Sequence, residues 1–221
     1  ASFVLTNANE TSQSYSLSAS INKSYDSGLN WMLGYAYSDA YDIAPMASAV
    51  SFSNYTERAF FDPQEQVSSR SNYNITHRFT GLINYSTFWF DGYQSKLSFY
   101  LSANEGTPYS YAYNGTSDPY NGTPWLDRLD NVLLPGAKRN DQDGSWWVKA
   151  DVKFTQQLPA FDEHKLEMFI VVDNLTNLLN DEWGVLNQVN FPNNVEEGNV
   201  AEPRVGDASL YEIRLGVKYD F

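Results

Sequence analysis

The sequence predicts an all-β protein built from antiparallel strands, and two observations carry this prediction. Apolar and polar residues alternate with a period of two in seven stretches, as in strands that have one apolar and one polar face. Short turns and long polar segments connect these stretches alternately. Residues 211–221 are the clearest stretch, because every odd position is aromatic or aliphatic and the even positions are mostly charged.

Six of the stretches pair into three predicted hairpins, and the seventh stands alone. The first hairpin turns tightly at residues 26–28, the second at 88–92 and the third at 158–163. The predicted strands are 14–22 with 30–38, 75–85 with 96–104, 146–154 with 166–172, and 211–221.

The composition excludes several classes of protein. No run of ~18 apolar residues is present, so a helical membrane span is excluded. The net charge of -13 argues against nucleic acid as a partner, because phosphate binding needs clusters of Lys and Arg. Aromatic residues nevertheless make up 16% of the chain. A chain that is rich in aromatics yet hydrophilic on average is typical of transmembrane strands, which place apolar residues at every second position.

The long polar segments lie near residues 39–71, 106–144 and 176–207. Long loops without secondary structure are uncommon in compact soluble domains, but they are expected outside the membrane in outer-membrane barrels, whose periplasmic turns are short. We therefore expect a transmembrane β-barrel segment in the outer membrane of a Gram-negative bacterium, in contact with membrane lipid. Its long loops would be extracellular, and its short turns and Phe221 periplasmic.

Seven strands are too few to close a single-chain barrel, and the number is odd, whereas such barrels have an even number of strands from eight upward. A barrel must close because an open edge in lipid leaves backbone groups unpaired. Either residues 2–6 begin an eighth strand, or the chain is part of a larger wall. Residues 2–6 are too short to span a membrane, so the second interpretation is favoured.

Two resemblances agree with a larger barrel. Arg214, Gly216, Tyr219 and Phe221 match the polar-x-Gly-x-x-aromatic-x-aromatic pattern that resembles the assembly signal of outer-membrane barrels. Residues 14–38, 75–79 (Ile-Thr-His-Arg-Phe), 106–111 (Gly-Thr-Pro-Tyr-Ser-Tyr) and 172–177 (Val-Asp-Asn-Leu-Thr-Asn) resemble elements of TonB-dependent outer-membrane receptors, most closely the Oar-like group.

The resemblance implies that residues 1–221 form the C-terminal portion of a 22-stranded barrel that takes up a scarce ligand. It implies four partners: the remaining barrel strands, a plug domain, the outer-membrane assembly machinery, and an inner-membrane energy-coupling protein that acts through the plug. The plug is absent from this chain. Two alternatives stay open: a self-contained small barrel that acts as an adhesin or structural protein, and a soluble β-sandwich that binds carbohydrate.

The sequence predicts binding rather than catalysis, with no catalytic residues, cofactor or dedicated metal site. No Ser/His/Asp arrangement can be argued for the two histidines, His77 and His164, so structural roles are expected. Asp141, Asp143 and Gly144 look like the start of a calcium loop, with Asp127 and Asp130 nearby. The Glu that should complete an EF-hand is missing, so loop calcium is only an option.

Two sets of residues are candidates for function. An aromatic cluster in the second long segment is suited to contact a ligand, although packing between loops is an equal alternative; its members are Tyr109, Tyr111, Tyr113, Tyr120 and Trp125. Charged residues at polar positions of the strands are expected to face the lumen, where they would pair with one another and hold a plug or water. They are Arg78, Lys96, Lys149, Asp151, Lys153, Glu167, Asp173, Glu212, Arg214, Lys218 and Asp220.

Overall fold

A computed structural model describes residues 7–90, 92–113, 131–161 and 164–221. Seven long strands are joined in antiparallel order, and short elements lie in the connections between them. The long strands are β1 (Gln13–Ser24), β2 (Leu29–Asp42), β4 (His77–Phe90), β5 (Tyr93–Asn104), β7 (Trp147–Leu158), β8 (Lys165–Asp173) and β10 (Glu212–Asp220). The short elements are α1 (Ser51–Thr56), β3 (Ser69–Arg70), β6 (Ser110–Tyr111), α2 (Leu175–Leu179), β9 (Asn194–Val195) and α3 (Gly206–Ser209).

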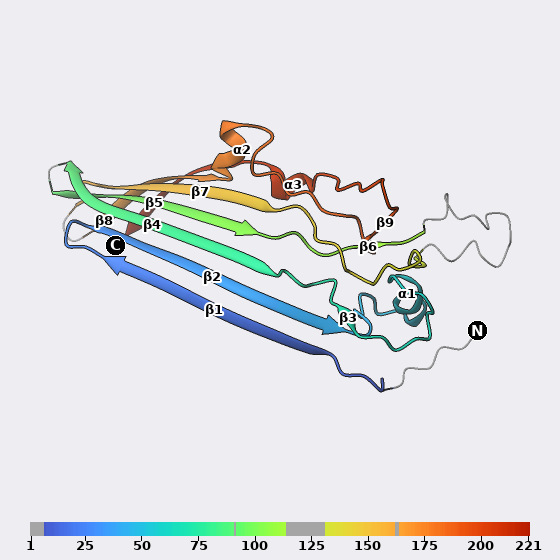
Figure 1. Ribbon diagram of the computed structural model, residues 1–221. Coiled ribbons are helices and arrows are strands. Elements are labelled where there is room, and N and C mark those ends of the chain that lie inside the picture. The colour runs from blue at the N-terminus through green and yellow to red at the C-terminus, as the bar shows by residue number, and fades with distance from the viewer. Residues whose placement is uncertain (1–6, 91, 114–130, 162–163) are drawn as a thin grey trace.

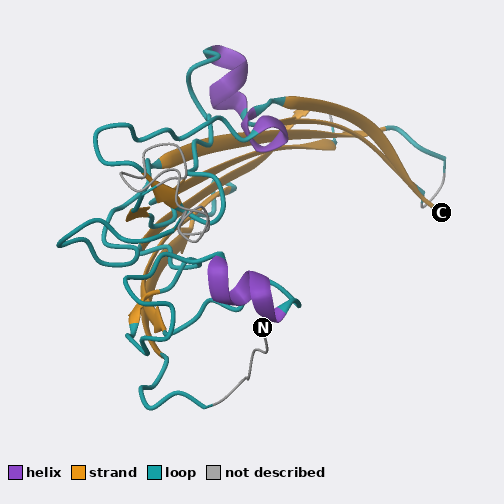
Figure 2. Cartoon of the chain, turned by 90° about the vertical axis from the view of Figure 1, so that its right-hand side faces the viewer, coloured by secondary structure: helices purple, strands orange, loops and turns teal. Residues whose placement is uncertain are grey.

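The long strands form one sheet in the order β1-β2-β4-β5-β7-β8-β10, and β3 extends it beside β2. Each long strand pairs with its neighbours along the chain, so every long-strand pairing is a hairpin or the return from a long connection. The short turns meet at one end of the sheet, together with the C-terminus, and α1, β3, β6 and β9 gather at the other (Figure 1). The sheet curves and does not close, since β1 and β10 are its two edges (Figure 2).

The predicted all-β antiparallel fold is confirmed, and all seven predicted strands are present. Several predicted strand bounds were wrong; Trp146 and Tyr211, for example, precede β7 and β10. Ile75 precedes β4 rather than lying in it, whereas β2 continues to Asp42, into the segment predicted as a loop. β4 and β7 continue to Phe90 and Leu158, because pairing persists into the predicted turns, past a bulge between Thr87 and Phe90.

The long segments are also not structureless, because the short helices and strands lie in them. Strand bounds depend on cross-strand hydrogen bonds, and residue alternation does not report where those bonds stop. Residues 2–6, with their alternative eighth strand, lie outside the described part of the chain.

The register aligns apolar side chains from strand to strand on one face of the sheet, because directly opposed residues of antiparallel strands project to the same side. We call this the apolar face. One row across it contains Trp31, Ile83, Phe99, Val152, Val172 and Ile213, and the next contains Leu29, Tyr85, Leu97, Phe154, Ile170 and Leu215. The opposite, polar face carries rows such as Asn30, Asn84, Ser98, Lys153, Val171 and Arg214.

The apolar residues do not run straight across the sheet but move steadily along the strands. On β1 the first apolar residue is Tyr15, whereas on β10 it is Ile213. Followed through the register, Ile213 lies level with Lys23 of β1, which is eight residues beyond Tyr15. The apolar band therefore crosses the strands obliquely.

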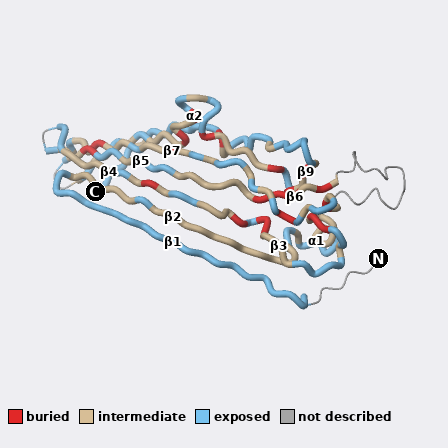
Figure 3. Tube along the Cα trace, viewed as in Figure 1, coloured by how far each residue is buried: buried red, intermediate tan, exposed pale blue. Residues whose placement is uncertain are grey.

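Most of the buried residues lie at the loop end, where most of the red segments of Figure 3 are, although Ser95 and Gln156 are buried near the short turns. Among the described residues, the fully buried apolar ones are Ala59, Phe60, Tyr109, Ala112, Leu133, Ala150, Val189 and Val195, and all but Ala150 lie outside the long strands. In contrast, Leu17 is 68% exposed and Leu215 is 78% exposed on the apolar face. No element of the described chain covers that face as a second layer.

Candidate functional site: the loop layer and the polar face

The described parts of the three long connections pack on one another and form what we call the loop layer, residues 43–76, 105–113, 131–146 and 174–211. Backbone bridges join distant parts of it, including Phe60 with Val132 and Ala112 with Leu133. The two-residue strands β6 and β9 pair in parallel, which ties the second connection to the third. The layer is therefore a folded unit at one end of the sheet.

Buried asparagines join these segments, because one Asn side chain can donate and accept at once. Asn140 is fully buried: its Nδ2 donates to Arg70 O at 2.7 Å and to Asn72 Oδ1 at 2.6 Å, and its Oδ1 accepts from the Ser110 hydroxyl. Its φ of 58° lies in the left-handed region, which Asn tolerates better than most residues. Replacing Asn140 would remove both a residue that tolerates the left-handed backbone conformation and the side-chain hydrogen bonds to Arg70, Asn72 and Ser110.

Asn174, which follows the last residue of β8, also joins separate loop segments through its side chain. Its Nδ2 donates to Gly184 O and Ser209 O, and its Oδ1 accepts from Thr176 and from the Asn177 amide. Gly184 approaches so closely that a Cβ there would lie 2.0 Å from Asn174 Oδ1. The Val-Asp-Asn-Leu-Thr-Asn segment, residues 172–177, thus caps α2 and fixes the third connection against the sheet.

The structure brings together two members of the predicted aromatic cluster. Tyr109 and Tyr111 lie edge to face with ring centroids 6.0 Å apart, and Tyr109 packs with Val189 and Val195. Tyr109 is only 7% exposed, so most of its surface serves packing between loops. Tyr113 lies nearby, where its amide donates to Val132 O. Tyr120 and Trp125 lie outside the described residues.

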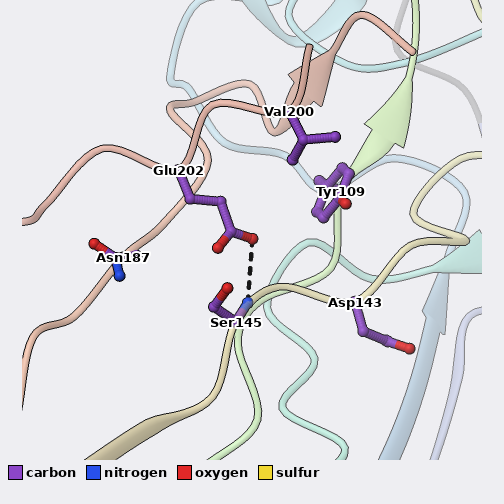
Figure 4. A pocket seen from close by; sticks show the side chains of 6 residues that line it. All are labelled: Tyr109, Asp143, Ser145, Asn187, Val200 and Glu202. Carbon is purple, nitrogen blue, oxygen red and sulfur yellow. Dashed lines mark hydrogen bonds between the residues drawn. The ribbon is translucent and has the colours of Figure 1, made fainter. Parts of the chain in front are cut away.

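Tyr109 also borders an open polar hollow of about 500 Å³, shown in Figure 4. Asp143 and Glu202 flank it, and Glu202 accepts a hydrogen bond from the Ser145 amide at 3.1 Å. Burial, together with Tyr111 and these carboxylates, raises the pKa of Tyr109 to about 12. The Tyr109 phenol therefore stays neutral and can donate or accept a hydrogen bond at physiological pH.

The calcium option gains no support from the described residues, which hold no cluster of three or more His, Cys, Asp or Glu. Asp143 forms an ion pair with Arg70, and Asp141 accepts from the Lys138 amide. Gly144 passes against Gly106, where an added Cβ would lie 2.7 Å from Thr107 O. Asp127 and Asp130 lie outside the described part of the chain.

A second hollow, of about 460 Å³, lies between residues 58–69 and 133–139, and no sequence pattern predicted it. Arg58 and Arg139, which lie 81 positions apart in the sequence, both line it. Arg139 forms an ion pair with Asp42 at 2.8 Å, and its side chain is only 5% exposed. No local motif contains both arginines, so only the folded loops could reveal this site.

The predicted lumen-facing charges all lie on the polar face of the sheet. Several pair as expected: Arg214 with Asp173 and, at 3.8 Å, with Glu212; Lys149 with Asp151 at 3.3 Å; and Lys218 with Asp220 at 2.7 Å. Lys153 lies over the ring of Phe169 at 5.1 Å from its centroid. Arg78, Lys96 and Glu167 complete the charged set on this face.

The residues of the predicted assembly signal divide between the two faces. Gly216 lies opposite Phe169 on the polar face, where the Phe169 ring occupies the space that a Cβ would need, 2.2 Å away. Tyr219 is on the apolar face and its hydroxyl contacts His164 Nδ1 at 2.7 Å; Phe221 follows the strand. The other histidine, His77, contacts the Tyr35 hydroxyl and stacks on Trp146. An assembly role for this strand stays a prediction.

Comparisons with protein-family models, with curated proteins and with solved structures found no match for this chain. The resemblance to TonB-dependent receptors therefore depends on the motifs quoted above. Within the described residues, no helix is both long enough and apolar enough to cross a membrane.

Proposed function

We propose that this chain forms part of the wall of an outer-membrane β-barrel receptor, and that it binds and transports a ligand rather than catalysing a reaction. The observation that carries the proposal is the apolar face. Seven strands expose aligned apolar rows that no other part of the described chain covers. A soluble protein would bury such a face, whereas lipid covers the outer face of a membrane barrel.

The slant of the apolar band supplies a second, geometric argument. Eight residues of displacement correspond to ~26 Å along the strands, and six strand spacings to ~29 Å across them, so the band is inclined by ~40°. Strands of transmembrane barrels tilt by roughly 35–45°. The displacement therefore matches what tilted strands need for their apolar residues to stay at one depth in the membrane.

Strand length agrees with the same interpretation. The long strands contain between 9 and 14 residues, and a tilted transmembrane strand needs ~9–11. The two open edges then require further strands, because unpaired backbone groups in hydrocarbon cost several kcal/mol each. We propose that these strands, from the same polypeptide or another, complete a barrel like that of the TonB-dependent receptors, with charges of the polar face toward its lumen.

The two alternatives lack these supports. A β-sandwich needs a second sheet against the apolar face, and the only other sheet in the described residues is the two-residue pair of β6 and β9. A self-contained barrel needs β1 to pair with β10, and the register does not join them.

Membrane fractionation with a refolding step tests the proposal. The protein that contains this chain should sediment with outer membranes and resist extraction by urea. The 221-residue chain refolded alone in detergent should give no heat-modifiable, protease-resistant monomer, because its two edges stay open. A protein that remains soluble without detergent would contradict the membrane assignment. A closed monomer of the isolated chain would instead favour the small-barrel alternative.

A further inference from the structure

We propose that the hollow lined by Arg58 and Arg139 binds the carboxylate of a small amphiphilic organic acid. The inference deepens the proposed function by naming a ligand class for the loop layer. It rests on that function only for the claim that the bound acid is taken up, and the binding itself is a separate claim.

The first argument is the hydrogen bonding of Arg139. Its Nη2 donates to Asp42 Oδ1 at 2.8 Å and, in a longer hydrogen bond, to Ser69 O at 3.4 Å. These bonds hold this end of the guanidinium in place. Its Nη1 is buried and has no hydrogen-bond partner among the residues that the structure describes. A buried N–H without an acceptor is costly, and an oxygen from a ligand would remove the cost.

Arg58 supplies the second donor. Its Nη1 donates to Ile43 O at 2.6 Å and its Nη2 to Pro63 O at 2.7 Å, while its Nε is buried without a partner. Both acceptors are neutral main-chain carbonyls, so no carboxylate of the described residues is hydrogen-bonded to this cation. Burial and repulsion from the neighbouring Arg139 charge lower the pKa of Arg58, against smaller opposite contributions from Tyr55 and Asp42. A bound anion would relieve that repulsion.

The rest of the hollow selects the kind of anion. Ile43, Ala59, Phe60, Leu133 and Ala137 give it an apolar wall that suits a hydrocarbon or aromatic group. Asp62 and Glu65 also line the hollow and are exposed. These two carboxylates disfavour ligands with several negative charges. A single carboxylate on an apolar body fits both features, and guanidinium groups match carboxylate geometry.

Titration of benzoate and hexanoate into the detergent-extracted protein, with empty micelles as the blank, tests the proposal. Both acids should bind saturably, and benzamide, which has the shape of benzoate without its charge, should bind at least about tenfold more weakly. Arg58→Gln should weaken benzoate binding by about tenfold or more, whereas Arg58→Lys should weaken it less. Arg204→Gln is the matched control, because Arg204 also donates to a main-chain carbonyl but lies outside the hollow, and it should leave binding unchanged.

Limited proteolysis of each variant separates loss of binding from loss of the fold. If Arg58→Gln disrupts the loop layer, the comparison of benzoate with benzamide on the unchanged protein decides whether the hollow recognises a carboxylate. Equal binding of benzoate and benzamide, or no saturable binding of either acid, would overturn the site. Saturable binding to a protein that transports nothing would leave the site in place and contradict only the proposed uptake.

Discussion

The loop layer contains nearly all of the fully buried apolar side chains of the described chain, although Phe61, Leu179 and Trp183 are exposed there, whereas no described element covers the apolar face of the sheet. Phe60, Tyr109 and Leu133 are buried at the loop end, but Leu17 and Leu215 are mostly exposed on the strands. The described chain therefore contains one region with a small buried core of its own and one whose apolar rows have no protein cover. This difference, rather than the amount of strand, is what supports our proposal of a membrane wall that carries an extracellular binding layer.

The largest expected effect comes from charge on the apolar face. Phe99→Arg should destabilise the protein in lipid by ~2–4 kcal/mol, because Phe99 lies in a central apolar row that hydrocarbon would cover. Asn84→Arg is the matched control on the polar face, where Asn84 faces Asn30 and Ser98. Urea unfolding in vesicles measures both. Equal costs on the two faces would remove the contrast between them.

The loop layer should respond to the loss of its buried asparagine. Asn140→Ala should cost about 1–3 kcal/mol, because Arg70 O and Asn72 Oδ1 lose their shared donor in a buried site. Trypsin should then cut faster near Lys138 and Arg139 without cutting the strands. The exposed Asn199→Ala provides the control and should change nothing. Faster cleavage throughout the strands would mean that the two regions are not separate in stability.

A smaller effect is expected where the sheet packs on its polar face. Gly216→Ala should cost about 1 kcal/mol, because the new methyl group must displace the Phe169 ring and its contact with Lys153. Gly81→Ala should be nearly neutral, since its Cβ would meet Leu101 and Leu33 at ordinary distances of 3.5 and 3.6 Å. Thermal unfolding in detergent compares the two. An equal loss at both glycines would refute the role assigned to Phe169.

The smallest effect is a pH dependence confined to the loop layer. The pKa of Tyr109 is raised to about 12 by burial, so its folded form keeps the proton that the unfolded chain loses near the ordinary value of 10.0. Its contribution to stability is therefore complete below pH 10 and is lost as the pH rises toward 12. Proteolysis of the loops across this range should show the loss, and Tyr109→Phe should abolish the part due to this residue. An unchanged profile in Tyr109→Phe would contradict the assignment.

Much of the sheet could be predicted from sequence, and little of the loop layer could. Alternation at Leu97, Phe99 and Leu101 reports a strand and its two faces directly, because side chains of a strand alternate. That Arg58 and Arg139 line the same hollow, by contrast, depends on how two long connections fold over each other. Nothing in the local sequence around Asn140 indicates that it bonds to Asn72. Such contacts have no period, so only the three-dimensional structure reveals them.

The most direct test of the central claim asks what covers the apolar face. The chain has no cysteine, so Ile83→Cys and Asn84→Cys each place one nitroxide label on adjacent residues of β4 that face opposite sides. Accessibility to oxygen and to a water-soluble nickel chelate is then measured by electron paramagnetic resonance in bilayers. We expect the label at position 83 to be reached by oxygen and shielded from nickel, and the label at 84 not to show that lipid signature. Nickel access at position 83 equal to that of a water-exposed label would contradict the account.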